Sequence, residues 1–450
     1  MNEAESLLGH LENVLKNNQY KQLSGILNVN PQYNPYIVKL YNSASIPKKH
    51  LDSMVEMHKY FGGDWGAFNE VVISFIQLSQ EMNPWSAVES FDLYTKYLND
   101  LAVAFSNSKR GGIIVDLLKS SVEEILPLAT KLDIQLYYKE DCRQPRLTYI
   151  ATILLKVFNN IRSQAGEEDQ QLKLKKTILL FMGNKLCQVY FKIGNPLLCR
   201  NVFSNMNNAN LQFSYFPPDQ QVTYRYYLGR FYFIKNQFID SYQHFEWCLN
   251  KMVHMQNHKN ITQLLKYWIP AGIMLGKFMN LTQINLVFYN GQGPAFLSVY
   301  QKISDSIKQG NFQLFYSLLD ENYSFLKQNQ LLVALSSKCN LLILRNLIKK
   351  VWIITGRQPK LNFDDIKLAL QLLIANSNKV LMYLDQDQTI ENIFVSLIDQ
   401  NLVKGKLFPR LRVVLLSKIN VFPTVSEINF VKFGHGQEGR LSSGDKWMAA

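Results

Sequence analysis

A cluster of basic residues near the C-terminus is the feature of this sequence with the clearest chemical meaning. Between Asn401 and Lys432 there are six Lys and Arg residues and one Glu, a local net charge of +5. Two more cations precede the cluster in a short connector. Clustered cations of this kind suit contact with nucleic-acid phosphates, which does not depend on base sequence. The predicted phosphate-binding residues are Lys404, Lys406, Arg410, Arg412, Lys418, Arg357 and Lys360.

These charges have a second interpretation, in which they form a solvated rim around a contact with another protein subunit. The helix expected just before the cluster argues against base-specific reading, because its polar residues are Glu391, Asn392, Ser396 and Asp399. A helix that reads the major groove usually presents Arg, Lys, Asn or Gln. We therefore expect any binding of RNA or DNA here to be sequence-non-specific.

A second group of cations is spread over the helices expected in the middle of the chain. It can be read as ordinary solvated helix surface, or as the place where a small acidic partner lies along the helices. The residues in question are Arg225, Arg230, Lys235, Lys251, Lys266 and Lys277.

Motifs that would indicate an enzyme are weak. Gly434, Gly436 and Gly439 spell GxGxxG, but no strand precedes them and no helix follows, as a dinucleotide site requires. His254 and His258 are four residues apart, yet no Glu lies between them, so there is no HExxH zinc motif. We expect no catalytic residues, no bound metal and no cofactor.

Composition indicates a folded protein with a polyanionic or acidic partner. The chain has 450 residues, 47% of them hydrophobic, and a formal net charge of +13. Such an excess favours nucleic acid, anionic membrane or acidic proteins as partners. The five cysteines are scattered without a CxxC, which indicates free thiols in a reducing compartment. We find neither a signal peptide nor an apolar run long enough to span a membrane, and expect a soluble intracellular protein without membrane contact.

The basic cluster needs a scaffold, and residues 331–430 have the pattern of a winged helix. A long apolar segment from Leu331 predicts a first helix, and NFDDIKLALQLL predicts a second, with Asn362 as its N-cap. TIENIFVSLID predicts a third helix that begins at Thr389. Beyond Gly405 the residues become β-branched and apolar, which predicts a β-hairpin that projects the cations.

Upstream of this region, residues 81–330 read as one helix after another. Six residues follow the spacing of a tetratricopeptide repeat, in which Gly229 lets the partner helix approach: Leu228, Gly229, Tyr232, Ser241, Phe245 and Cys248. We therefore predict a mainly α fold, a right-handed helical solenoid ending in a winged helix. Residues 1–80 are expected to form an N-terminal helical segment, and residues 431–450 a flexible tail.

Several phrases resemble a known family. LIDQNLVKGKLF and RVVLLSK resemble the end of a PCI domain, in which a helical solenoid runs into a winged helix. Within that family the chain is most similar to the PCI subunit of the TREX-2 nuclear mRNA-export complex. The phrases that carry this similarity are NPWSAVESFDLY, KLCQVYFKIGNPLLCRNVF, YRYYLGRFYF, WIPAGIMLGKF and RNLIKK, and it spans roughly residues 75–418.

The resemblance implies a non-enzymatic subunit. Its partners would be a scaffold subunit with its own PCI domain and a small, acidic, disordered subunit shared with the proteasome lid. Two adjacent winged helices would form a basic platform for RNA or DNA, in the nucleus and at the nuclear pore of the nuclear envelope. The alternative is a purely structural PCI subunit of a lid, signalosome or splicing-linked complex that does not bind nucleic acid.

Overall fold

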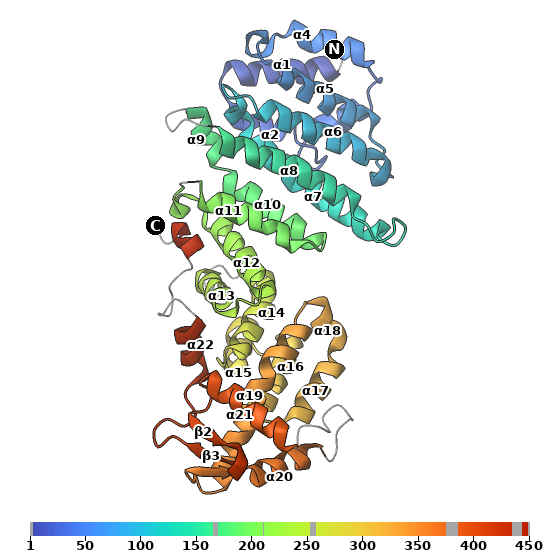
Figure 1. Ribbon diagram of the computed structural model, residues 1–450. Coiled ribbons are helices and arrows are strands. Elements are labelled where there is room, and N and C mark those ends of the chain that lie inside the picture. The colour runs from blue at the N-terminus through green and yellow to red at the C-terminus, as the bar shows by residue number, and fades with distance from the viewer. Residues whose placement is uncertain are drawn as a thin grey trace. The chain divides into compact units, whose positions relative to one another are not determined.

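The computed structural model describes residues 3–164, 170–209, 211–252, 258–374, 386–433 and 443–448 (Figure 1). Within these ranges the fold is helical apart from a three-stranded sheet near the C-terminus. The chain divides into two compact units, Met1–Tyr224 and Arg225–Ala450. The divisions predicted near residues 80 and 330 lie inside these units. No described helix is both long enough and apolar enough to cross a membrane.

Unit 1 is an array of packed helices. Its helices are α1 (Glu3–Lys16), α2 (Leu23–Ile26), α3 (Pro35–Tyr41), α4 (Lys48–Met57), α5 (Gly66–Glu81), α6 (Ala87–Phe105), α7 (Val115–Leu136), α8 (Pro145–Ser163), α9 (Gln170–Lys176), α10 (Leu179–Lys192), α11 (Cys199–Asn207) and the first part of α12 (Pro218–Ile234). Short 3-10 turns are η1 (Tyr20–Gln22), η2 (Tyr60–Gly63), η3 (Gly111–Ile114), η4 (Pro196–Leu198) and η5 (Phe213–Tyr215). In this array α5 packs on α6, α6 on α7 and α7 on α8, while α2 packs on α7 and α10 on α8.

Large aromatic side chains fill the space between these helices. Phe75 of α5 and Tyr97 of α6 are fully buried, with ring centroids 5.9 Å apart. The Tyr97 hydroxyl donates to the carbonyl oxygen of Leu27 at 2.8 Å, so its polar atom is satisfied inside the core. At the start of α6 the Ser86 hydroxyl caps the helix by accepting a hydrogen bond from the backbone N–H of Glu89.

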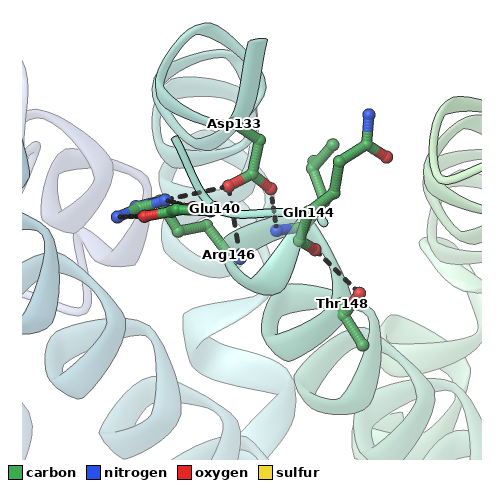
Figure 2. Close-up of polar contacts among 6 residues, drawn as sticks. Asp133, Glu140, Gln144, Arg146 and Thr148 are labelled. Atoms are coloured by element: carbon green, nitrogen blue, oxygen red, sulfur yellow. Dashed lines mark hydrogen bonds and ion pairs between the residues drawn. The ribbon is translucent and has the colours of Figure 1, made fainter. Parts of the chain in front are cut away.

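The turn between α7 and α8 is closed by a buried carboxylate (Figure 2). Asp133 is fully buried and accepts from the backbone N–H of Leu147 at 2.8 Å, which satisfies an otherwise unpaired donor in the first turn of α8. The guanidinium of Arg146 contacts Asp133 at 3.2 Å and holds both carboxylate oxygens of Glu140, at 2.8 and 3.0 Å. Two acidic groups and one Arg therefore fix the connection between the two helices.

Unit 2 is also largely helical, and it contains the sheet. Its helices are the rest of α12, α13 (Phe238–Met252), α14 (His258–Met274), α15 (Leu281–Tyr289), α16 (Phe296–Gln309), α17 (Phe312–Glu321), α18 (Tyr323–Gln328), α19 (Leu332–Ile354), α20 (Phe363–Ile374), α21 (Asp387–Asp399) and α22 (Val425–Phe433). The strands are β1 (Lys360–Asn362), β2 (Gly405–Phe408) and β3 (Val413–Leu416), and the 3-10 turns are η8 (Pro409–Leu411) and η9 (Ser443–Met448).

Helices α12 and α13 pack as the repeat spacing predicted. A Cβ atom added at Gly229 would lie 2.8 Å from Cε1 of Phe245, closer than real Cβ atoms approach other atoms. Phe245 is fully buried, and its ring also lies 6.3 Å from that of Tyr267 on α14. The absence of a side chain at Gly229 is therefore what lets the Phe245 ring reach the backbone of α12.

The winged helix is present in the predicted order. Helices α19, α20 and α21 pack on one another, and α21 packs on β2 (Figure 1). Phe363 of α20 and Phe394 of α21 are buried with nearly parallel rings 6.2 Å apart. Strand order is β1-β3-β2 and both pairings are antiparallel. The structure is thus a mainly α array of helices that ends in a winged helix.

Three local expectations were wrong. The connector before the second helix contains a strand, β1, which adds a third strand to the predicted hairpin. The third helix begins at Asp387, so Thr389 lies in its first turn and does not cap it. The region expected as a flexible tail includes the end of α22 and the turn η9, in which Asp445 is 2% exposed.

Candidate nucleic-acid interface

Two of the predicted phosphate-binding lysines lie in one row across the sheet. Lys360 of β1 and Lys406 of β2 both pair with Leu415 of the central strand β3. All three side chains are exposed, whereas Leu361 and Val414, on the opposite face, are buried against the helices. Side chains alternate between the faces of a sheet, so the register aligns the two ammonium groups on the solvent face.

Four other predicted cations surround this row and are also exposed. Lys404 precedes β2 and Lys418 follows β3, and the two segments are joined by a hydrogen bond from Ser417 N to Lys404 O at 2.9 Å. Arg410 lies in η8 at the tip of the hairpin. Arg357 follows α19 with a left-handed φ of 57°. Within the part of the chain that the structure describes, none of these four, nor Lys360 or Lys406, has an acidic side chain within 4.0 Å.

Arg412 differs from the other cations of the hairpin because two carboxylates hold it. Its Nη2 and Nε atoms lie 2.9 Å from the two oxygens of Asp387, at the start of α21. Its Nη2 atom is also 2.9 Å from Oδ1 of Asp364, in the first turn of α20. Arg412 was predicted from the sequence to bind phosphate. In the structure its guanidinium instead pairs with two carboxylates, and these ion pairs hold the hairpin against the N-termini of α20 and α21.

Helix α21 carries no cation along its whole length, from Asp387 to Asp399. Asn392 and Asp399 are exposed, and Glu391 and Ser396 are half-buried. The helix that enters the major groove in DNA-reading winged helices therefore offers no Lys or Arg here. The cations lie on the sheet, on its flanking segments and at the tip of the hairpin.

Exposed apolar side chains accompany these cations. Phe408 at the end of β2 is exposed, Leu411 in η8 is 71% exposed, and Ile419 after β3 is 80% exposed. An exposed aromatic ring beside lysines can stack on a nucleic-acid base. Exposed Leu and Ile are equally suited to contact with a protein partner.

Sequence reasoning missed Arg345, which is buried in α19. Its Nη2 atom donates to the carbonyl oxygen of Pro423 at 2.7 Å, and its Nε atom to that of Leu402 at 3.2 Å. The guanidinium lies 5.7 Å from the centre of the Phe422 ring. Burial lowers the pKa of Arg345 from its ordinary value, although a guanidinium remains charged at neutral pH. Arg345 thus ties α19 to the segments that flank the sheet.

The six cations of the middle helices do not form one open surface. Arg225 is buried, so it does not belong to a solvated helix surface. Arg230 lies 4.3 Å from the centre of the Tyr267 ring, and Lys277 lies 4.6 Å from that of Tyr242. Lys266 is half-buried, whereas Lys235 and Lys251 are exposed.

The structure gives no support to the two weak motifs noted in the sequence, the histidine pair and the GxGxxG glycines. Across the described ranges no three His, Cys, Asp or Glu side chains come together as metal ligands. His254 and the GxGxxG glycines lie outside the described residues.

The chain is similar in sequence to proteins from yeast and frog. No family model matches the chain. The nuclear mRNA export protein THP1 of Saccharomyces cerevisiae is 30% identical over 407 residues, which cover 84% of this chain and 88% of THP1. PCI domain-containing protein 2 of Xenopus laevis is 23% identical over 364 residues, covering 80% of this chain and 86% of that protein.

The chain belongs to the PCI-domain family. The resemblance noted in the sequence, both to the family and to its mRNA-export branch, is confirmed. Protein CSN12 homolog of Schizosaccharomyces pombe is a further relative, 27% identical over 239 residues that cover 53% of each chain. The sheet that carries the cations and the helices packed on it are accordingly the winged helix of a PCI domain.

Proposed function

We propose that this PCI protein is a non-enzymatic subunit of a nuclear, transcription-coupled mRNA-export complex of the TREX-2 type. Similarity to a nuclear mRNA export protein over most of both chains supports this role. The helical array would dock a scaffold subunit with its own PCI domain and the small acidic subunit shared with the proteasome lid. The complex would act in the nucleus, at the nuclear pore.

We further propose that the winged helix contributes half of a sequence-non-specific platform for RNA or DNA. The observation that carries this proposal is the row of Lys360 and Lys406 on either side of Leu415, on the exposed face of the sheet. Lys404, Arg410 and Lys418 extend the positive charge around it. Phosphates would bind these cations, while the cation-free α21 makes no base contacts that could select a sequence.

Salt dependence of RNA binding tests the platform. In the assembled complex, Lys360→Gln together with Lys406→Gln should weaken binding of single-stranded RNA. Each lost phosphate contact lowers the slope of log K against log salt by about 0.7, so the double variant should lose about 1.4. Fluorescence anisotropy between 50 and 200 mM salt measures this slope.

A matched control removes two other exposed lysines of the same unit. Lys302→Gln on α16 with Lys327→Gln on α18 changes net charge by the same amount but lies outside the winged helix. It should leave the slope unchanged. The platform is excluded if the sheet variant keeps the parent slope, or if both double variants lower it equally.

For the acidic subunit we propose helices α12 to α14, where Lys235 and Lys251 present exposed cations. Charge reversal, Lys235→Glu with Lys251→Glu, should reduce co-purification of the acidic subunit but not of the PCI scaffold. Loss of both partners together would indicate general damage to the fold.

A purely structural PCI subunit is the second candidate. Arg412 is neutralised by Asp364 and Asp387, and Leu411 and Ile419 are exposed on the same hairpin, which suits a protein contact. In that case the Lys360 and Lys406 variant would leave RNA affinity unchanged, and Leu411→Glu would release a partner subunit. Measuring RNA affinity and subunit content on the same preparations separates the two functions.

A further inference from the structure

The last described segment of the chain is recognised by a specific set of side chains in unit 2. Asp445 of η9 is 2% exposed, so its carboxylate has left the solvent. The Tyr232 hydroxyl on α12 donates to Oδ2 of Asp445 at 2.6 Å. Nε2 of His244 on α13 lies 3.3 Å from the same oxygen. Burying a carboxylate is costly unless donors reach it, and this one is met from two helices.

A second contact is made three residues further on. The guanidinium of Arg225 donates from Nη2 to the backbone carbonyl of Met448 at 3.3 Å, and the Met448 side chain is 5% exposed. Because a 3-10 turn has three residues per turn, Asp445 and Met448 lie on the same side of η9. The segment therefore contacts α12 and α13 through one carboxylate and one backbone carbonyl, and the residue that supplies the carbonyl, Met448, is buried.

The recognising side chains are held in place by the packing of the helix pair. Arg225 and Tyr232 are seven residues apart on α12, about two helical turns, and so share a face. The Tyr232 ring stacks on His244 at 5.5 Å with an interplanar angle of 8°. The Arg225 guanidinium lies 4.1 Å from the centre of the Trp247 ring. Each donor is thus oriented by an aromatic or imidazole partner on the same helix pair.

We propose that this face of α12 and α13 is a peptide-binding site, and that the C-terminal segment of the chain occupies it in cis as an exchangeable ligand. Its ligand class is a short peptide with an Asp followed three residues later by an apolar residue. Tyr232 and His244 bind the carboxylate, and Arg225 donates a hydrogen bond to the backbone carbonyl of the apolar residue. The proposal is independent of nucleic-acid binding and of the export function.

Peptide binding to the full chain tests the site directly. The probe is a fluorescent ten-residue peptide with the sequence of residues 441–450. Asp445→Asn in the chain removes the charge of the cis ligand while leaving the site intact, so the probe should bind this variant at least tenfold more tightly than it binds the parent chain. Adding Tyr232→Phe should weaken binding again, by about tenfold, since a hydrogen bond to a charged group is lost.

Two controls separate recognition from a change in net charge. Asp320→Asn removes an exposed carboxylate of α17 and should behave as the parent chain does. A probe with Asn in place of its Asp should bind the Asp445→Asn chain at least tenfold more weakly than the original probe does. Equal binding of the two probes, or equal affinity of the parent and Asp445→Asn chains, overturns the proposal.

Hydrogen exchange provides a second test, in which Asp445 is kept and no peptide is added. Tyr232→Phe should raise amide exchange in residues 443–448 about tenfold, while amides in the buried part of α13 keep their protection. Unchanged protection of residues 443–448 in this variant would show that Tyr232 does not hold the segment, and would contradict the proposal.

Discussion

Arg412 and Asp387 form a two-point ion pair that joins the hairpin of the winged helix to the start of α21. Nε and Nη2 of the arginine each lie 2.9 Å from one oxygen of the aspartate. Asp387 is also in the first helical turn, where negative charge is favoured by the helix dipole. The basic cluster near the C-terminus thus contains one arginine whose role is architectural.

Arg412→Lys should therefore lower stability while preserving charge. Lysine cannot reproduce the two-point geometry, and the pair is partly exposed, so we expect a loss of about 1 kcal/mol in the free energy of unfolding. RNA affinity of the assembled complex should remain close to that of the parent. Arg410→Lys, at the unpaired tip, is the matched control and should change stability little. Thermal unfolding and anisotropy measure the two quantities.

Arg345→Met should destabilise unit 2 more strongly. The substitution keeps the length of the side chain but leaves the carbonyl oxygens of Leu402 and Pro423 without their donor, at a cost of about 1–3 kcal/mol for each buried unsatisfied group. Lys349→Met, on the exposed side of the same helix, should have little effect. Urea unfolding compares them, and equal midpoints would contradict a structural role for Arg345.

Gly229→Ala should be destabilising although alanine favours helices. The new methyl group would meet Phe245, which is buried and cannot move without disturbing its neighbours, so we expect a net cost of about 1–2 kcal/mol. Gly9→Ala in α1 meets no atom within 4 Å and should instead stabilise the chain by up to about 1 kcal/mol. We expect the melting temperature to fall below that of the parent in Gly229→Ala and to rise above it in Gly9→Ala.

Glu140 should make the stability of unit 1 depend on pH. Hydrogen bonds from Arg146 hold the pKa of Glu140 below its ordinary value of 4.5. A carboxylate whose pKa is lowered by folding stabilises the protein above its unfolded pKa, and this contribution is lost as pH falls through the folded value. Glu140→Gln should thus lower the melting temperature at pH 7, and the difference from the parent should shrink as the pH falls below the ordinary pKa of 4.5 and Glu140 becomes protonated.

Glu56→Gln on α4 is the control for this pH series, because it removes an exposed carboxylate far from Arg146 in the chain. Its melting temperature should follow that of the parent at every pH. A Glu140→Gln deficit that stays constant from pH 7 to pH 3.5 would show that charge is not the cause.

Much of this protein could be predicted from local patterns in the sequence. Apolar spacing predicted the helices of the winged helix, and the β-branched run beyond Gly405 predicted its hairpin, because these signals act within a few residues along the chain. The small residue at Gly229 predicted a close helix pair for the same reason. The family was also recognisable from phrases of contiguous residues.

Tertiary structure decided what the predicted side chains contact. Lys360 lies in a strand and is aligned with Lys406 across the sheet. Arg412 is paired with Asp387 and is not available as a free cation. Asp445 accepts a hydrogen bond from Tyr232 and contacts His244. Each of these outcomes depends on strand register or on partners distant in the chain. Residue type and local spacing determine which helix or strand forms, but ion pairs and buried hydrogen bonds form between segments whose proximity only the folded core creates.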